Sequence, residues 1–547
     1  MTAARRKEKR EDQAMAMMER PQVRNTIGGK CWEHPFERFH LKAYVPDNPL
    51  DGQVNNYGFR APLLLVLEET PRDMDSAVAF ARESGLAKIA ADRDTSVLFI
   101  SPTKEGGWQR EDESLYAAVI AEIKMIQVYR DGIVENYDFF AKQFKGYFVR
   151  GAIFRADIYS FGASADYAAK HLLKTIQGEY LWGPGEITPA MCSMEGLSVT
   201  PEVERRDIAI LSVGNSEAIN RAFEGCQHLL IKDRADYERD YDTFVKRFKM
   251  WCGHMQYEPD FPALGMREDA GSHTVTTSPD NMGAYKNQKA HRVGYFAYYN
   301  QDLFDRGPAP LVIGFHGGGD SSMYLTYVAG WWEVAHKYGF LFVSVENHLD
   351  VTATEAVELI GELKKRYPID EHRIYATGFS MGSGKTWDCF QEYPEVFAGF
   401  MPCSALFPVY TTFFGNPVTE KLNKTVPGAV FYSGGEESPL PELPFQGAAC
   451  LERVQYVVQV NRLKKAEAFQ NASYDQKDLW EETMWAVPGD RVERIPDPSR
   501  GSTLTIHYYD SEDGVCRTAF AGVSGQQHEC RQHSCEAAWK FVSQFTR

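Results

Sequence analysis

The feature that most constrains the fold is a repeat of four apolar segments, which occur in the same order in both halves of the chain. Each segment is short and continuous in its apolar residues, as expected of a buried strand. The matched pairs are 61–67 with 309–313, 96–101 with 339–344, 158–164 with 374–380, and 210–217 with 430–437. A single match could arise by chance, but the ordered set predicts two consecutive units of one architecture.

Stretches with helical spacing alternate with these apolar runs. In the second half, the strand-like runs are 309–315, 340–345, 373–377, 428–432, 503–509 and 517–523, and the helical patterns are 328–338, 354–367 and 537–545. Strands that alternate with helices are typical of a mostly parallel sheet with helices on its faces. We therefore predict an α/β fold, present in two tandem copies.

The chain of 547 residues is too long for one compact domain and fits two of ordinary size. We expect a charged N-terminal segment at 1–29, a first domain at 30–255, a linker at 256–289 and a second domain at 290–547.

A long segment at 451–500 contains Trp480, Trp485 and Pro488. Two interpretations are open for it: part of a lid or pocket wall, or a plain surface insertion.

Acidic residues outnumber basic ones by 75 to 59, and the formal net charge is −16. Proteins that bind nucleic acid or anionic membrane surfaces carry the opposite balance, which argues against both classes of partner. The N-terminal segment is charged from Arg5 to Asp12 and lacks the apolar run of a signal peptide or a membrane span. We expect a cytoplasmic protein, and the sequence is compatible with a homo-oligomer.

The ten cysteines are scattered and form no Cys-x-x-Cys pair. Cys530 and Cys535 alternate with His528 and His533, a pattern that could hold zinc, but no second thiolate pair lies nearby. Reduced thiols of a cytosolic protein are the favoured interpretation. We expect neither a metal nor an organic cofactor.

The second half contains a Gly-x-Ser-x-Gly motif, Gly378 to Gly382, between a predicted strand and a predicted helix. In that context the turn is tight, the flanking positions must lack bulk, and the hydroxyl of Ser380 is exposed above the sheet. The segment His316-Gly317-Gly318-Gly319 directly follows an upstream strand, where backbone N–H groups can stabilise an oxyanion. The two motifs together favour a serine hydrolase.

A serine nucleophile needs a base and an acid that orients the base, in the chain order serine, acid, histidine. The acid is expected in the loop after the strand at 428–432. Glu437 is favoured there over Glu436, because it lies three residues beyond the glycine at 434. The base is expected between the last strand and the last helix. His528 is favoured over His533, which lies nearer the helix and is expected to cap it or pack there.

Four motifs resemble those of the α/β-hydrolase superfamily: HGGG at 316–319, GFSMG at 378–382, SGGEE at 433–437 and GQQHE at 525–529. In particular, they are similar to esterases of the polyhydroxybutyrate depolymerase and feruloyl-esterase type. The resemblance covers roughly residues 290–547.

The resemblance implies that Ser380 is the nucleophile, Glu437 the acid and His528 the base. It also implies an oxyanion hole made by the N–H of Met381 and that of Gly317 or Gly318. The expected reaction is hydrolysis of a small or oligomeric carboxylic ester through an acyl-enzyme. A serine peptidase of the same fold and a non-catalytic ligand-binding relative are the alternatives.

The first half carries an altered version of these motifs. In Gly162-Ala163-Ser164-Ala165-Asp166 an aspartate replaces the second glycine, and Glu68-Glu69-Thr70-Pro71 stands where the second half has its glycines. Proline has no N–H to donate, so the oxyanion hole is predicted to be lost. Ser164 and Glu217 are retained, and His254 and His273 are candidate bases only by proximity. The first domain is therefore interpreted as a non-catalytic copy.

Overall fold

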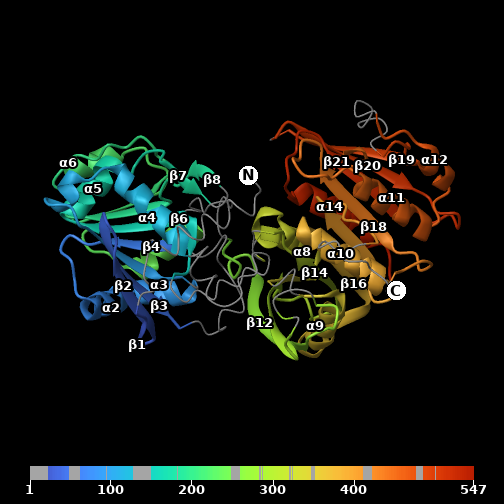
Figure 1. The fold of residues 1–547 in the computed structure, drawn as a ribbon, viewed down its shortest axis with the longest axis horizontal. Helices are drawn as coiled ribbons and strands as arrows, with labels where there is room; N and C mark the ends of the chain where they lie inside the picture. Colours follow the sequence, from blue (N-terminus) through green and yellow to red (C-terminus); the bar gives the residue numbers. More distant parts are fainter. Residues whose placement is uncertain are drawn as a thin grey trace. The chain divides into compact units, whose positions relative to one another are not determined.

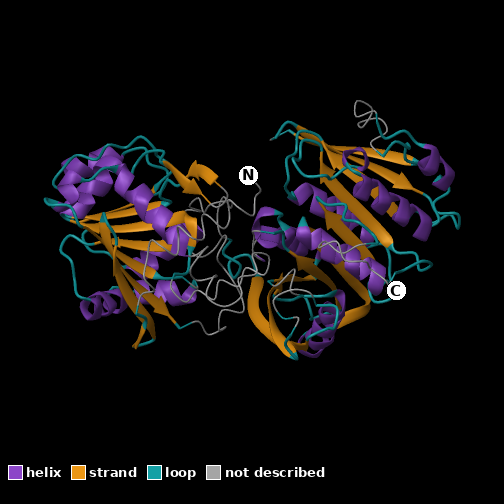
Figure 2. Cartoon of the chain, viewed as in Figure 1, coloured by secondary structure: helices purple, strands orange, loops and turns teal. Residues whose placement is uncertain are grey.

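The computed structural model describes residues 22–47, 62–93, 95–126, 149–180, 183–247, 259–281, 285, 287–318, 322, 324–346, 351–410, 422–475, 485–498 and 500–547. The chain divides into two compact units, Met1–Asp260 and Phe261–Arg547. Each unit is built on one large sheet with helices on both of its faces (Figures 1 and 2).

The first unit contains a sheet of nine strands in the order β1-β2-β3-β5-β4-β6-β9-β10-β11. Its strands are β1 (Arg24–Thr26), β2 (Gly29–Pro35), β3 (Phe39–Pro46), β4 (Pro62–Leu67), β5 (Val97–Pro102), β6 (Ala152–Phe161), β9 (Met191–Glu195), β10 (Ala209–Val213) and β11 (Leu229–Lys232), and a separate hairpin joins β7 (Gln177–Tyr180) to β8 (Gly183–Glu186). Its helices are α2 (Met74–Glu83), α3 (Leu86–Asp92), α4 (Glu113–Met125), α5 (Ala163–His171), α6 (Glu217–Asn220) and α7 (Tyr237–Asp242).

The second unit contains a sheet of ten strands in the order β12-β13-β15-β14-β16-β17-β18-β21-β20-β19. Its strands are β12 (Met266–Thr276), β13 (Ala290–Asn300), β14 (Ala309–Phe315), β15 (Leu341–Val345), β16 (Ile369–Phe379), β17 (Gly399–Cys403), β18 (Ala429–Gly435), β19 (Arg491–Asp497), β20 (Ser502–Tyr509) and β21 (Thr518–Val523). Its helices are α8 (Trp331–Tyr338), α9 (Ala353–Arg366), α10 (Met381–Glu392), α11 (Ala448–Val460), α12 (Ala466–Asn471) and α14 (Gln532–Val542).

The two sheets share one strand order over their central part, and the predicted α/β fold in two copies is confirmed. The strands β4, β5, β6, β9 and β10 occupy the places of β14, β15, β16, β17 and β18, and both sets pair in parallel. In the second unit, α8 and α14 pack together on one face, whereas α9 and α10 cover the other.

The local sequence explains why these elements form where they do. All seven residues of β14 are buried, as expected of a strand that lies in the middle of a parallel sheet between two helical layers. The helix α9 begins with a capping box between Thr352 and Glu355, and it buries residues 356, 359, 360 and 363 along one stripe.

The expected linker at 256–289 needs correction, because part of it is a strand. Met266–Thr276 pairs antiparallel with β13 along its whole length and forms the edge of the second sheet. Of its eleven residues only Met266, Gly271 and Val275 are buried. A strand with so few apolar residues lacks the alternation that marks strands in sequence.

The segment 451–500, for which a lid or pocket wall and a plain surface insertion are the two interpretations, contributes regular elements to the second unit. It continues α11 and contains all of α12 and of the edge strand β19. The Trp485 side chain is fully buried in the core, in contact with Tyr432 and Phe520. Trp480 lies outside the described residues.

The imidazole of His507 on β20 is completely buried, and its Nδ1 accepts the amide N–H of Gly489 at 3.1 Å. Burial, assisted by the charges of Arg494 and Lys465, lowers the pKa of His507 to about 4. Between this value and the ordinary pKa of about 6.5, the unfolded chain binds a proton that the folded chain rejects. Folding stability contributed by this site is therefore lost as the pH falls from about 6.5 towards 4.

As the pH falls from 7.5 to 4.5, we expect the His507 site to lower the free energy of unfolding by about 2–3 kcal/mol. His507→Asn keeps an acceptor for Gly489 but does not titrate, so its free energy of unfolding should fall less steeply with acidification. Urea denaturation of both proteins at the two pH values measures the difference. Equal losses in the variant and the unmodified protein would contradict the assignment.

Candidate active site

Ser380 lies in a strained turn between β16 and α10. Its backbone has φ 53° and ψ −117°, a conformation that residues with a side chain rarely adopt. The two flanking glycines are required by packing. A Cβ on Gly378 would overlap the carbonyl of Gly382, and a Cβ on Gly382 would overlap the carbonyl of Phe315 on β14. The turn thus presents the Ser380 hydroxyl above the carboxyl end of the sheet.

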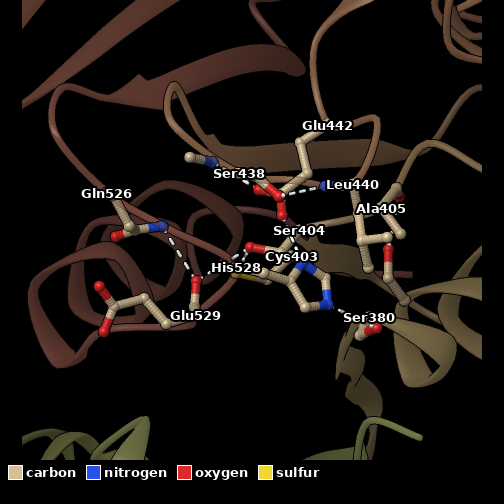
Figure 3. Close-up of polar contacts among 12 residues, drawn as sticks. Ser380, Cys403, Ser404, Ala405, Ser438, Leu440, Glu442, Gln526, His528 and Glu529 are labelled. Carbon is tan, nitrogen blue, oxygen red and sulfur yellow. Dashed lines mark hydrogen bonds and ion pairs between the residues drawn. The ribbon is translucent and has the colours of Figure 1, made fainter. Parts of the chain in front are cut away.

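His528 lies in the loop 524–531 that follows β21, called here the base loop. Its Nε2 is 2.8 Å from the Ser380 Oγ (Figure 3). The centroid of its ring is 4.9 Å from that of Phe379. The side chain is 20% exposed, so a small reactant can reach it. The rival His533 lies on α14, where burial lowers its pKa. The structure therefore brings together Ser380 and His528, the residues that the sequence analysis names as nucleophile and base.

The carboxylate beside His528 belongs to Glu442, not to either of the predicted glutamates. Glu442 Oε1 is 2.5 Å from His528 Nδ1, and the Glu442 side chain is fully buried (Figure 3). Glu437 instead accepts a hydrogen bond from the Gln527 side chain at 3.2 Å, and its side chain is exposed. Glu436 accepts the amide of Gly525 at 3.4 Å. The prediction that Glu437 lies beside the imidazole is therefore corrected, because Glu442 takes that place.

The reason for this difference is the path of the chain after β18. The amides of Glu436 and Glu437 donate to the carbonyls of 523 and 526, so the chain first runs beside the base loop, and both carboxylates accept hydrogen bonds from groups of that loop other than His528. It then returns at Glu442, whose Oε2 accepts the amide of Gly435 at 2.5 Å. A lone glutamate in the apolar, proline-rich stretch 439–445 is the signal in the sequence that could have identified it.

Neighbouring groups hold Glu442 in place. The Gln446 side chain accepts the backbone N–H groups of Glu442 at 2.6 Å and Leu443 at 2.8 Å. The Tyr432 hydroxyl donates to the Glu442 carbonyl at 2.7 Å. A carboxylate fixed at Nδ1 accepts the N–H of that atom, which leaves the lone pair of Nε2 facing the serine hydroxyl.

The backbone groups expected to bind an oxyanion also lie beside Ser380. A Cβ on Gly317 would be 3.3 Å from the Ser380 Cβ, and one on Gly318 would overlap the Met381 side chain. Met381 is the first residue of α10, and the N–H groups of a helix's first turn have no partner within the helix. His316, which is buried, contacts the carbonyl oxygens of Gly317 and Glu346. Gly319 lies outside the described residues.

The first unit has a glycine at the position of Ser380. Its strand-to-helix turn is Gly162, whose φ 50° and ψ −119° are nearly those of Ser380. The strand register gives the same correspondence. Leu67 of β4 pairs with Ser160, just as Phe315 of β14 pairs with Gly378. The residue two positions further along is Gly162 in the first unit and Ser380 in the second. The sequence match of Ser164 with Ser380 is therefore displaced by two residues and is corrected.

Ser164 lies inside α5, with its hydroxyl buried and donated to the carbonyl of Leu67 at 2.6 Å. A Cβ on Gly162 would overlap the carboxylate of Glu69, which also accepts the amide of Ala163 at 3.4 Å. Glu69 stands in the place of Gly317. A carboxylate thus fills the position that a serine side chain would occupy.

The remaining candidate residues lie elsewhere. Glu217 begins α6 and pairs with Arg221, His273 lies on β12 of the second unit, and His254 is outside the described residues. The Sγ atoms of Cys530 and Cys535 are 3.5 Å apart and buried. Within the described ranges, no cluster of three or more metal-ligating side chains is found, and no helix is long and apolar enough to cross a membrane.

The second unit has the α/β-hydrolase fold. A serine at a strand-to-helix turn above a mostly parallel sheet, followed along the chain by a carboxylate and a histidine, defines the arrangement of that fold. The loop after β14 supplies the additional amides beside the serine.

No protein-family model matches the sequence. Over 105 residues the chain is 30% identical to a bifunctional acetylxylan esterase/xylanase of Neocallimastix patriciarum. That match spans 18% of this chain and 16% of the relative.

Solved structures with similarity to the chain include esterases. An acetyl xylan esterase from Aspergillus awamori is 12% identical, with 50% of this chain and 98% of that chain covered at a TM-score of 0.31. The feruloyl esterase module from Clostridium thermocellum is 12% identical, with 53% and 92% covered and a TM-score of 0.31. A thermostable esterase is 18% identical, with 35% and 52% covered and a TM-score of 0.25.

Proposed function

We propose that the second unit is a serine hydrolase that cleaves carboxylic esters through an acyl-enzyme. The observation that carries the proposal is the hydrogen-bonded series Ser380–His528–Glu442, with distances of 2.8 and 2.5 Å, on a strained turn. The 30% identity of a 105-residue segment to a bifunctional acetylxylan esterase/xylanase supports an ester as the substrate and makes acetylated carbohydrates the first class to test.

In the first half of the reaction, the Ser380 Oγ attacks the ester carbonyl while His528 Nε2 takes its proton. Glu442 stabilises the imidazolium that forms at His528. The N–H of Met381, with that of Gly317 or Gly318, binds the negative oxygen of the tetrahedral intermediate. His528 then gives its proton to the leaving alcohol, and the acyl group remains on Ser380.

In the second half, water replaces the alcohol. His528 takes a proton from the water, the hydroxide attacks the acyl carbonyl, and the tetrahedral intermediate collapses with return of the proton to Ser380. The products are the acid and the free serine. Ser380 is not used as a cap by its own helix, which leaves its hydroxyl available for this chemistry.

A fluorophosphonate, which phosphonylates activated serines, tests the proposal on the full chain. We expect loss of p-nitrophenyl acetate hydrolysis in step with a mass increase on the peptide that contains Ser380, because the neighbouring imidazole activates that hydroxyl. Peptide mapping by mass spectrometry locates the label. Labelling of another serine with Ser380 unmodified, or full activity after Ser380 is labelled, would refute it.

A further inference from the structure

Cys403 and Ser404, at the carboxyl end of β17, contact all three elements that carry the proposed triad. The Cys403 carbonyl accepts the amide N–H of Ser380 at 2.9 Å. The Ser404 amide donates to the carbonyl of Ser433 on β18 at 2.8 Å. The Ser404 hydroxyl donates to the carbonyl of Glu529 in the base loop at 2.9 Å (Figure 3). One dipeptide therefore joins the nucleophile turn, the strand that leads to the acid, and the base loop.

Ser404 adopts a conformation that serine does not favour. Its φ is 57°, in the left-handed region where glycine is the usual residue. The residue is also fully buried, so it does not contact a substrate directly. A strained backbone conformation persists only where surrounding interactions hold it. At Ser404 the hydrogen bond from the hydroxyl to the Glu529 carbonyl is such an interaction.

The first unit shows what the fold requires at this place in the absence of the triad. Its equivalent residue is Gly196, with φ 73°. The Gly162 amide donates to the Glu195 carbonyl and the Gly196 amide to the Val213 carbonyl, as their counterparts do in the second unit. A Cβ on Gly196 would find its nearest atom 3.9 Å away, so space does not exclude a side chain. The left-handed backbone conformation is therefore common to both units, whereas the hydroxyl is present only in the unit that carries the proposed triad.

We propose that Ser404 is a positioning residue that holds the base loop so that His528 faces Ser380. The inference rests on the proposed function and extends it to a residue outside the triad. The carbonyl of Glu529 directly follows His528 in the chain, and the Gln526 side chain donates to the same carbonyl at 2.9 Å. Without the hydrogen bond from the Ser404 hydroxyl, the base loop has one hydrogen bond fewer at its centre.

Two substitutions distinguish the effect of losing the Ser404 hydrogen bond from the effect of relieving its backbone strain. Ser404→Ala removes the hydroxyl and keeps a side chain in the left-handed region, while Ser404→Gly removes both. We expect kcat for p-nitrophenyl acetate to fall about tenfold in both variants with KM unchanged, since a small displacement of a catalytic group acts on the chemical step. The midpoint of thermal unfolding should be no lower for Ser404→Gly than for Ser404→Ala, because glycine relieves the strain.

A comparison in the absence of the base shows whether Ser404 acts through it. In a His528→Ala background, Ser404→Gly should lower the residual rate no further, since residues that act as a unit are not additive. Ser383→Ala is the matched control. Ser383 is fully buried and donates its hydroxyl to the carbonyl of Ala405 at 2.9 Å, but it does not contact the base loop. We expect its kcat to remain that of the unmodified protein.

The outcomes separate this inference from the proposed function. Unchanged kcat in Ser404→Gly, with Ser380→Ala inactive, overturns the role of Ser404 alone. A further loss from Ser404→Gly in the His528→Ala background, or an equal loss in Ser383→Ala, also overturns it, because the effect would then be general to the fold. Full activity in Ser380→Ala overturns the proposed function and this inference with it.

Discussion

Replacing Ser380 with alanine should lower kcat for p-nitrophenyl acetate by roughly 10⁵–10⁶-fold, the scale seen when a triad serine is removed. Without its hydroxyl no acyl-enzyme can form, and only the backbone amides and substrate binding remain to assist attack by water. Purified full-length protein and variant are compared by steady-state kinetics. Thermal denaturation should show that the fold is kept, since alanine fits the space that the serine leaves.

Ser164→Ala provides the matched control in the first unit. Ser164 likewise lies close to a strand-to-helix turn, but it is fully buried and its hydroxyl is donated to the carbonyl of Leu67. The turn itself is Gly162, and the Glu69 carboxylate fills the space beside it. We expect Ser164→Ala to keep the kcat of the unmodified protein. Loss of activity in that variant, with Ser380→Ala still active, would place the working site in the first unit.

The parts of the site that could be predicted from sequence are those that local chemistry dictates. Gly378 and Gly382 are required because a Cβ on either would overlap backbone atoms one turn away or on β14. The strand before them and the helix after them are marked by their own periodicity. His528 follows directly from the last parallel strand, so few residues separate it from an element that the sequence identifies.

The identity of the carboxylate beside His528 depends on tertiary contacts that sequence spacing does not record. Glu437 has the expected distance in sequence from the end of β18, yet it is exposed and faces Gln527. Glu442 becomes the partner of His528 because Gln446 and Tyr432 hold its backbone and the chain returns to the sheet. These are tertiary interactions, and a spacing rule cannot distinguish between two glutamates five residues apart.

The displaced match between the two halves has a different physical origin. Successive side chains of a strand alternate between its two faces, so a shift of two residues leaves the pattern of buried residues unchanged. The serine at 164 could therefore be matched with Ser380 without disturbing the apolar pattern of β6. Only the backbone torsions and the strand register show that Gly162 holds the position. Similarly, β12 escaped prediction because an edge strand needs few apolar residues.

Glu442→Gln should lower kcat by about 10⁴-fold while the fold is retained, the scale found when a triad carboxylate becomes an amide. The amide can hold the imidazole in the wrong tautomer, with the proton on Nε2, and it cannot stabilise the imidazolium that forms during attack. Glu442→Ala is less informative, because it also leaves the Gly435 amide buried without its acceptor. Steady-state kinetics on p-nitrophenyl acetate, with unfolding midpoints, measures both effects.

Glu437→Gln and Glu436→Gln are the controls, since they make the same chemical change within six residues of Glu442. Glu437 is exposed, and both carboxylates accept hydrogen bonds only from neutral groups of the base loop among the described contacts. Because neither faces the Nδ1 of His528, we expect kcat to be unchanged in both. Activity lost in Glu437→Gln and kept in Glu442→Gln would restore the assignment made from spacing. It would also mean that the base loop moves during the reaction, because Glu437 could reach His528 only after the 2.5 Å contact with Glu442 had been broken.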